Sequence, residues 1–167
     1  MTADGDTVVF VHAHPDDEAI FTGGTIVRLV AAGHRVVLVV ATGGELGEPP
    51  GDTAAAGGVA PGAVAARRNA ETATAADLLG IARVAWLGYH DSGMAGDAAN
   101  QHPEAFWAAD VEHATARLAR LLADEDPAAV VVYDEFGIYG HPDHVQVHRV
   151  GLRAAAAAGV ETVYHAT

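Results

Sequence analysis

The chain has 167 residues, of which 50% are hydrophobic and 19% charged, so we expect a folded globular protein with room for one substantial core. Acidic residues outnumber basic ones by 22 to 9, and the formal net charge is −13. This balance disfavours nucleic acid and anionic membranes as partners, because both are bound through lysine and arginine. The absence of cysteine excludes disulfides, thiolate metal ligands and cysteine nucleophiles. The amino terminus has no basic region before its short apolar run, so we expect no signal peptide, no membrane span and a cytoplasmic location.

Short apolar runs rich in β-branched residues alternate along the chain with longer, alanine-rich runs. The predicted strands are Thr7–Ala13, Arg35–Thr42, Ala82–Trp86, Ala128–Tyr133 and Glu161–Tyr164. The predicted helices are Glu18–Ala32, Ala63–Leu79, Glu104–Ala123 and Asp143–Ala158. The second strand almost lacks polar alternation, which is typical of a strand covered on both faces. This order predicts the α/β class, with a three-layer, mostly parallel, Rossmann-like sheet and helices on both faces.

Three polar loops follow predicted strands, at Gly43–Pro61, Gly88–His102 and Asp134–His141. The first is dominated by Gly, Pro and Ala and is too long for a plain connection, which is typical of functional loops. In a parallel sheet the loops after the strands meet at one edge, where ligand sites usually lie. We therefore expect the functional site at the carboxyl ends of the strands.

The run HPDDE at residues 14–18 places four acidic or imidazole side chains directly after the first strand. Carboxylates this close need a helix amino terminus or a bound cation to hold them. His14 and Asp17 are three residues apart and can converge across one turn, while Asp16 points elsewhere but stays near. A zinc hydrolase needs three protein ligands, an open water position and a nearby base, so this run supplies two ligands and the base. The alternative interpretation is ordinary capping of a helix by acidic residues.

A second run, HPDH at residues 141–144, follows the fourth predicted strand and begins a helix. His144 is the natural third metal ligand. His141 then remains as a proton donor or oxyanion stabiliser, with Asp143 orienting it and raising its pKa. From the residues alone, the roles of His141 and His144 can also be exchanged. The two runs together predict a mononuclear site with two His ligands and one Asp ligand.

These runs occur with GGELGE at 43–48, RNAE at 68–71, DSGM at 91–94 and YDEFGIYGHPDH at 133–144. The combination resembles the LmbE-like, or PIG-L, family of zinc-dependent deacetylases over nearly the whole chain, which implies a single deacetylase domain at residues 1–167. Within the family the likeness is greatest to the mycothiol-pathway subgroup, which implies removal of acetate from an N-acetylglucosaminyl-inositol. Members of this subgroup usually continue well beyond the fifth strand, so we expect the C-terminal part of the usual domain to be absent here.

The resemblance also implies a role for individual residues. It implies that His14, Asp17 and His144 bind Zn²⁺ and that Asp16 is the general base. It implies that His141 is the general acid or oxyanion stabiliser, oriented by Asp143, and that Tyr139 polarises the substrate carbonyl. It further implies contacts of Arg68, Asp91 and Glu48 with the sugar or its substituent.

Other functions compete with this interpretation. An amidase acting on a thiol conjugate or another sugar-linked amide is one alternative, and a non-catalytic module binding a metal or sugar is another. The spare carboxylate of Asp16 and the spare imidazole of His141 favour catalysis, because a pure binding site needs neither. Neither G-x-G-x-x-G after the first strand nor G-x-S-x-G is present, which argues against a dinucleotide oxidoreductase and a serine hydrolase.

Some features stay open at this level. Fe²⁺ is an alternative to Zn²⁺ in a site of nitrogen and oxygen ligands. The expected partner is a small N-acetylated sugar, and a homo-oligomer is compatible with the sequence. Among the remaining histidines, we expect His12 to be a packed or hydrogen-bonded core residue. His90 and His102 carry no spacing signal.

Overall fold

The computed structural model describes residues 5–47 and 60–167. Its strands are β1 (Thr7–His12), β2 (Arg35–Thr42), β3 (Arg83–Tyr89), β4 (Ala129–Tyr133) and β5 (Val163–Ala166). All four pairings are parallel, and the order in the sheet is β3-β2-β1-β4-β5. The chain therefore runs outward from β1 to β3, crosses back, and continues on the other side through β4 and β5. This confirms the predicted α/β fold with a parallel sheet.

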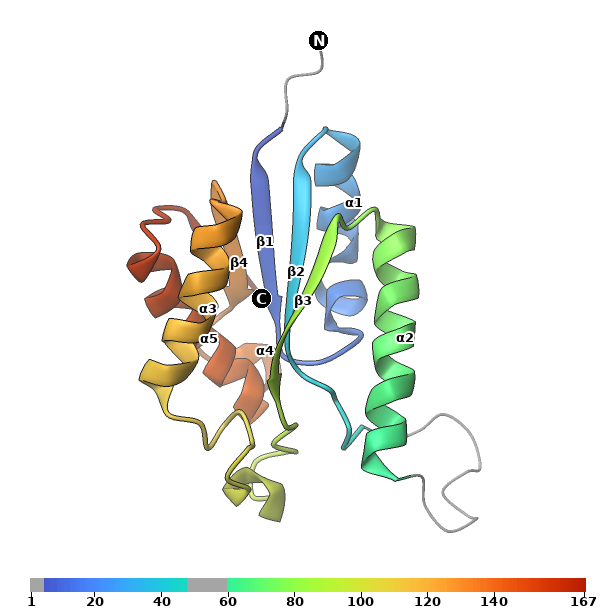
Figure 1. Cartoon of the computed structure of the whole chain (residues 1–167), viewed down its shortest axis with the longest axis vertical. Helices are drawn as coiled ribbons and strands as arrows, with labels where there is room; N and C mark the ends of the chain where they lie inside the picture. Colours follow the sequence, from blue (N-terminus) through green and yellow to red (C-terminus); the bar gives the residue numbers. More distant parts are fainter. Residues whose placement is uncertain (1–4, 48–59) are drawn as a thin grey trace.

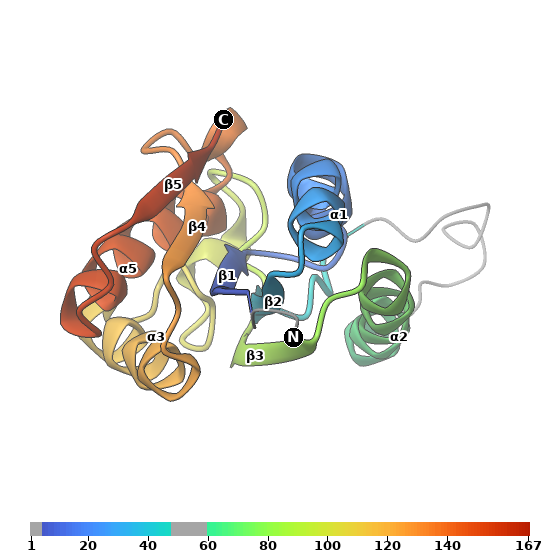
Figure 2. The same cartoon turned by 90° about the horizontal axis from the view of Figure 1, so that it is seen from above.

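The helices form the two outer layers. They are η1 (Glu18–Thr22, a π-helix), α1 (Gly23–Ala31), α2 (Pro61–Leu79), η3 (Ala98–Gln101, 3₁₀), α3 (Val111–Glu125), α4 (Gly137–Gly140) and α5 (Pro142–Ala157). In Figures 1 and 2, α1 and α2 lie on one face of the sheet, and α3 and α5 lie on the other. None of the helices in the described part of the chain is both long enough and apolar enough to cross a membrane.

The core lies on both sides of the sheet. Val9 and Val11 of β1 belong to the cluster that includes side chains of α3 and α5, while Val8 and Phe10 belong to the cluster with α1 and α2. Every residue of β2 after Arg35 is buried. Burial on both faces explains why this strand shows no polar alternation. Each fully buried aliphatic or aromatic side chain contributes about 1.5–3 kcal/mol, and this drives formation of the three layers.

The predicted helix Glu104–Ala123 was wrong at its start. Helix α3 begins at Val111, where the Asp110 carboxylate accepts the His113 N–H (2.9 Å) and caps the helix. The residues before it instead pair with the end of β3: His90 N–H donates to the Glu104 carbonyl and Phe106 N–H donates to the His90 carbonyl, both at 2.9 Å. Tertiary pairing therefore replaced the helical tendency of this segment.

The predicted helix Glu18–Ala32 divides into η1 and α1 at Thr22, whose φ of −130° is not helical. Gly23 and Gly24 follow, and glycine weakens a helix by about 1 kcal/mol relative to alanine. The π-turn buries Glu18 and directs the Thr22 hydroxyl to the His12 ring (2.8 Å). Such π-turns are frequent near functional sites. Two strand ends also differ from the prediction, because β3 continues to Tyr89 and β5 covers Val163–Ala166.

Candidate metal centre at the carboxyl ends of the strands

The two polar runs meet at one edge of the sheet. The run at 14–18 follows β1, the run at 141–144 leads from α4 into α5 just after β4, and β1 and β4 are neighbours. Six polar residues of the two runs are at most 7% exposed: His14, Asp17, Glu18, His141, Asp143 and His144. Three strand ends are involved, because Asp91 and Ser92, which follow β3, are also buried here.

His14, Asp17 and His144 face one another. The Asp17 Oδ2 atom lies 3.5 Å from His14 Nδ1 and 3.5 Å from His144 Nε2. Ligand atoms of His14, His141 and His144 also lie within 4.8 Å of one another, as do those of His14, Asp91, His141 and Asp143. A buried group of imidazole and carboxylate donors at these separations can hold a metal ion.

The His144 side chain tests whether these residues fit a metal ion. Among the described residues, neither of its ring nitrogens has a hydrogen-bond partner, although the side chain is 0% exposed. An unpaired buried polar atom costs about 1–3 kcal/mol, so a native protein seldom keeps one without a reason. The ring is fixed by stacking on Tyr133, with centroids 4.2 Å apart. A fixed nitrogen without a partner beside the Asp17 carboxylate fits a ligand of a divalent transition metal.

The electrostatics around His14 favour a cation. Its Nε2 atom lies 3.1 Å from Asp143 Oδ2 and 3.6 Å from Asp91 Oδ1. Burial alone would lower the pKa of His14, but Asp143, Asp17 and Asp91 outweigh burial and raise it well above the ordinary value. Burial would likewise raise the pKa of Asp17 and Asp91, but the His14 ring holds the pKa of Asp17 well below its usual range and that of Asp91 at about 2. Ionised carboxylates therefore surround this point.

The pKa values of His141 and His144 shift in the opposite direction to that of His14. Burial lowers the pKa of His144 to about 4 and also lowers the pKa of His141, against the effect of the carboxylates. Both rings are therefore neutral near pH 7 and keep a lone pair. Asp143 raises the pKa of His141, as expected, but burial and the charge of His14 outweigh this effect and lower the pKa on balance.

The Asp143 carboxylate has other partners than the His141 ring. It accepts hydrogen bonds from the hydroxyl and the backbone N–H of Ser92, and it contacts His14. The His141 ring instead accepts the Asp143 backbone N–H on Nδ1 (3.2 Å) and caps α5. Asp143 therefore joins the loop after β3 to the centre, a role that sequence patterns did not indicate.

A second buried network supports Asp17 from behind. The Tyr133 hydroxyl donates to Asp17 Oδ2 (2.7 Å) and accepts the Ala13 backbone N–H (3.1 Å). It also contacts His12 Nδ1 (2.8 Å), and His12 Nε2 contacts the Thr22 hydroxyl (2.8 Å). His12 is thus the hydrogen-bonded core residue that was expected. The contribution of Tyr133 was missed, since the last residue of an apolar strand looks like any other core aromatic.

Asp16 lies at the mouth of the centre. Its side chain is 55% exposed, and its φ of +93° is uncommon for a residue with a side chain. Backbone conformations of this kind cost about 1–3 kcal/mol and tend to occur at functional sites. The Asp16 N–H donates to Glu18 Oε2 (3.0 Å), which holds the turn. Burial, together with the charge of Asp17, raises the pKa of Asp16 on balance, against the lowering effect of Arg68.

Arg68 ties this turn to the loop after β2. Its guanidinium donates to Asp16 Oδ2, to the Pro15 carbonyl and to the Gly44 carbonyl, each at 2.7 Å. Gly44 has a φ of +60°, and a Cβ there would lie 2.5 Å from Arg68 Nη1, so this close approach requires glycine. The structure therefore places Arg68 against the Asp16 turn. The predicted contact with substrate stays a prediction.

Tyr139 and Asp91 border the centre on the solvent side. Tyr139 is 55% exposed, and its ring centroid lies 4.9 Å from that of His144. Gly137 lets the start of α4 pack against α5, because a Cβ there would lie 2.7 Å from the His144 Cβ. An open cavity of about 220 Å³ adjoins the centre and is lined by His14, Leu46, Gly47, Asp91, Gly93, Met94, Asp97 and His141. The remaining predicted site residue, Glu48, lies outside the described residues.

Comparisons with known proteins show to which family the chain is similar. The PIG-L family, described as GlcNAc-PI de-N-acetylase, matches residues 9–155. The 1D-myo-inositol 2-acetamido-2-deoxy-alpha-D-glucopyranoside deacetylase of Salinispora arenicola is 46% identical over 162 residues, which cover 92% of this chain and 52% of the relative. The enzyme of the same name from Thermobifida fusca is 44% identical, with 90% of this chain and 54% of the relative covered.

A solved structure shows the same likeness. The N,N′-diacetylchitobiose deacetylase of Pyrococcus horikoshii superposes with a TM-score of 0.73 at 28% identity, covering 92% of this chain and 50% of that chain. The chain thus spans about half the length of the relatives it matches. Because the family match runs from β1 into α5 and includes both polar runs, the chain belongs to the PIG-L family of de-N-acetylases.

Proposed function

We propose that this protein acts as a metal-dependent amide hydrolase that removes the acetyl group from the nitrogen of a small amino sugar, such as an N-acetylglucosaminyl-inositol. The observation that carries the proposal is His144, which lies buried beside Asp17 and stacks on Tyr133. Neither of its ring nitrogens has a hydrogen-bond partner within residues 5–47 and 60–167. The relatives that are 44–46% identical are named as deacetylases of an N-acetylated glucosyl-inositol, which supports the substrate class. We propose His14, Asp17 and His144 as the ligands and Zn²⁺ as the ion, with Fe²⁺ as the alternative.

A bound divalent metal supplies Lewis acidity, which lowers the pKa of a water molecule and polarises the amide carbonyl. Asp16 is the proposed general base. Arg68 binds one of its carboxylate oxygens (2.7 Å), which orients the group and leaves the other oxygen to accept a proton from the attacking water. The raised pKa of Asp16 brings it closer to the working pH and so favours proton transfer in both directions.

His141 and Tyr139 are the proposed donors to the carbonyl oxygen. The His141 Nδ1 atom accepts the Asp143 backbone N–H, so a neutral ring carries its proton on Nε2 and can donate from there. Tyr139 stays protonated because burial raises the pKa of its hydroxyl further, and the hydroxyl can donate as well. Donors directed at the oxygen where negative charge develops are worth about 2.7–4 kcal/mol each in acyl transfer. We propose that Asp143 acts by positioning His14 and the loop at Ser92.

The cavity beside the centre is the proposed place for the sugar. Asp91 lines it and can accept hydrogen bonds from sugar hydroxyls. Arg68 already donates three hydrogen bonds within the protein, so we propose that it positions Asp16 rather than binding substrate directly. The contact of Glu48, a single deacetylase domain over residues 1–167, the cytoplasmic location and a homo-oligomer stay predictions.

The test is acetate release by the purified chain from N-acetylglucosaminyl-inositol and from N-acetylglucosamine, with added Zn²⁺ and with chelator. Chelator-sensitive release that prefers the inositol conjugate is the expected result. Release only from an acylated thiol conjugate would favour the amidase alternative. Bound metal without release from any of these amides would contradict the proposal and favour a binding module.

A further inference from the structure

We propose that the chain carries a second divalent metal site at the rim of the sheet edge, formed by His90, His102 and Glu104. A ligand atom from each of these three side chains lies within 4.8 Å of the other two. The site is separate from the buried centre and exposed, with His90 52% and Glu104 70% accessible. It does not depend on the function proposed above.

The backbone beneath two of these ligands is paired before any metal binds. His90 pairs with the segment at 104–106 as a parallel bridge, through the Glu104 carbonyl and the Phe106 N–H, both at 2.9 Å. Phe106 is fully buried and anchors the segment in the core. The rings of His90 and His102 stack with centroids 5.1 Å apart and planes 5° apart. A rigid backbone under the ligands reduces the entropy lost on binding.

The separations suit a small transition metal. Four ligands at about 2.0–2.1 Å from a tetrahedral Zn²⁺ lie roughly 3.4 Å from one another. His90 Nε2 and Glu104 Oε2 are already 3.7 Å apart. His102 Nδ1 accepts the Glu104 N–H at 3.2 Å, a long and exposed hydrogen bond that the metal would replace. Two imidazoles with one carboxylate prefer Zn²⁺, Co²⁺ or Ni²⁺ over Mg²⁺ and Ca²⁺, which prefer oxygen ligands.

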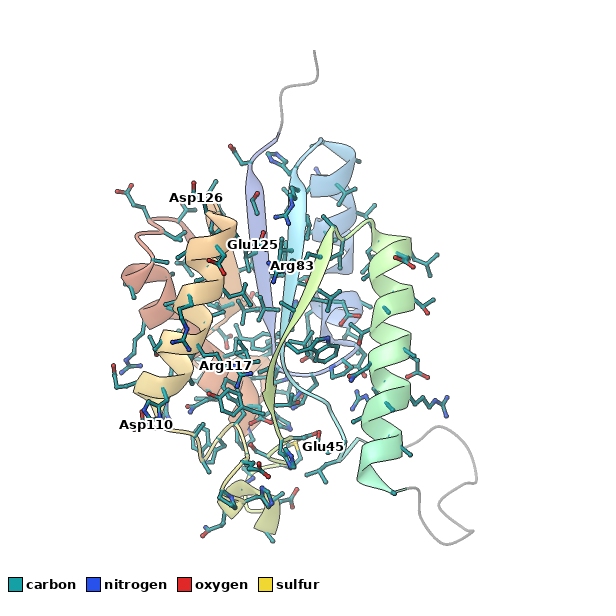
Figure 3. The ribbon with its side chains drawn as sticks, viewed as in Figure 1. Glu45, Arg83, Asp110, Arg117, Glu125 and Asp126 are labelled. Atoms are coloured by element: carbon teal, nitrogen blue, oxygen red, sulfur yellow. The ribbon has the colours of Figure 1, made fainter. Side chains whose placement is uncertain are left out.

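Glu45 adds negative charge and connects the rim to the centre. Its Oε1 atom lies 3.7 Å from His90 Nδ1 and accepts the Asp91 backbone N–H at 2.9 Å. Figure 3 shows Glu45 at the carboxyl end of β3. Asp91 in turn lies 3.6 Å from His14. The net charge of −13 also favours cations at an exposed acidic rim. A metal at the rim would therefore restrain the His90–Asp91 segment that borders the buried centre.

The experiment is calorimetric titration of the chelator-stripped chain with Zn²⁺, together with Co²⁺ titration followed by visible absorption. The rim variant is His102→Gln with Glu104→Gln. The matched control is His113→Gln with Glu112→Gln, which removes an equally exposed His–Glu pair on α3 and the same charge. Circular dichroism checks that both variants keep the fold.

We expect two Zn²⁺ equivalents in wild type and in the control, and loss of the weaker one in the rim variant. Removing a residue that hydrogen-bonds to a metal ligand weakens metal affinity about 10–100-fold. Losing two ligands themselves should therefore weaken Zn²⁺ binding at the rim site by at least about 10-fold. If the rim variant binds Zn²⁺ with the same stoichiometry and affinities as wild type, the rim site is wrong. One equivalent in wild type and none in the rim variant would support the rim site and contradict the buried centre.

Discussion

Two charged clusters occupy opposite ends of the same sheet, and they differ in what holds their charges. At the amino ends of β2 and β3, the Glu125 carboxylate at the end of α3 pairs with Arg35 and Arg83. Figure 3 shows Glu125 and Arg83 side by side at that end. At the carboxyl ends, several carboxylates surround the His14 ring.

The cluster at the amino ends is complete in itself. Its carboxylate is 6% exposed and has two guanidinium partners, while the arginines are 42% and 48% exposed, so water screens the guanidinium side of both pairs. The cluster at the carboxyl ends is buried, is bordered by a strained and exposed Asp16, and leaves both nitrogens of His144 without hydrogen-bond partners in the described chain. Ion pairs alone thus do not indicate a functional site. Buried ring nitrogens without hydrogen-bond partners, next to a strained backbone turn, do indicate one. The following changes test this contrast.

The largest effect is expected for Asp16→Asn. This change removes the proposed base but keeps the size of the side chain, so turnover should fall about 10²–10⁴-fold. Metal content should not change, because Asp16 is not a proposed ligand. Acetate release and metal analysis are compared with Asp77→Asn, an exposed change on α2. Turnover within a few-fold of wild type would remove Asp16 from the mechanism.

The next effect concerns metal binding by His144. The variant His144→Gln keeps a polar side chain but removes the proposed imidazole ligand. The Zn²⁺ affinity of the buried centre should fall at least about 100-fold, because changing only a residue that hydrogen-bonds to a metal ligand already lowers affinity about 10–100-fold. His113→Gln on the surface of α3 serves as the control. Unchanged affinity in His144→Gln would mean that the unpaired nitrogens of this ring have another explanation.

The variant Tyr133→Phe tests the support behind Asp17. It removes the hydroxyl that donates to Asp17 Oδ2 and accepts the Ala13 N–H. Zn²⁺ affinity should fall about 10–100-fold. The free energy of unfolding should fall by about 1–3 kcal/mol, because a buried hydrogen bond to a charged group is lost. The exposed Tyr164→Phe is the comparison, and equal metal affinities in the two variants would contradict a positioning role.

Metal affinity should also depend on pH. The pKa of His14 is raised well above its ordinary value, so the ring is protonated near neutrality and must lose its proton to bind a metal. The pKa of His144 is lowered to about 4, so that ring contributes no proton. Affinity should therefore rise with pH, about tenfold per unit while one proton is released. Calorimetry in buffers of different ionisation enthalpy counts this proton, and an affinity independent of pH near neutrality would contradict the assignment.

The smallest effect is expected at the opposite end of the sheet. Burial would raise the pKa of Glu125, but Arg35 and Arg83 lower it on balance. Its stabilising effect is thus present above the unfolded pKa of about 4.3 and is lost as pH falls through the lower folded value. Glu125→Gln should reduce the free energy of unfolding by no more than about 1 kcal/mol at neutral pH, without changing metal binding. Urea denaturation against Glu161→Gln measures this, and a large loss of metal affinity would contradict the contrast between the two ends.

Periodicity was enough to predict the layers of this fold but not every element boundary. The apolar runs at β1 and β2 are long, rich in valine and buried on both faces, so their strand character depends little on context. The segment at 104–110 has helical composition but pairs with His90, a partner that periodicity cannot reveal. The π-turn at η1 likewise depends on the position of His12 beside Thr22.

Spacing along the chain predicted which polar runs meet at this edge of the sheet. The runs at 14–18 and 141–144 follow adjacent strands, so a parallel sheet necessarily brings them to one edge. Which group each side chain contacts was not predictable in the same way. Asp143 accepts a hydrogen bond from Ser92 rather than from the His141 ring, and Arg68 donates to Asp16. Each of these partners lies on a segment distant in sequence, so local spacing cannot reveal it.

The sequence by itself determined the α/β architecture, the family and the two polar runs, because strand periodicity and local spacing are properties of neighbouring residues. The tertiary structure alone decided the pKa shifts of His14, His141 and His144, and the lack of hydrogen-bond partners for His144 among the described residues. It also decided the proximity of His90, His102 and Glu104. These properties depend on burial and on distances between segments far apart in the chain. Such quantities arise only when the sheet has formed and its strand ends have been brought together.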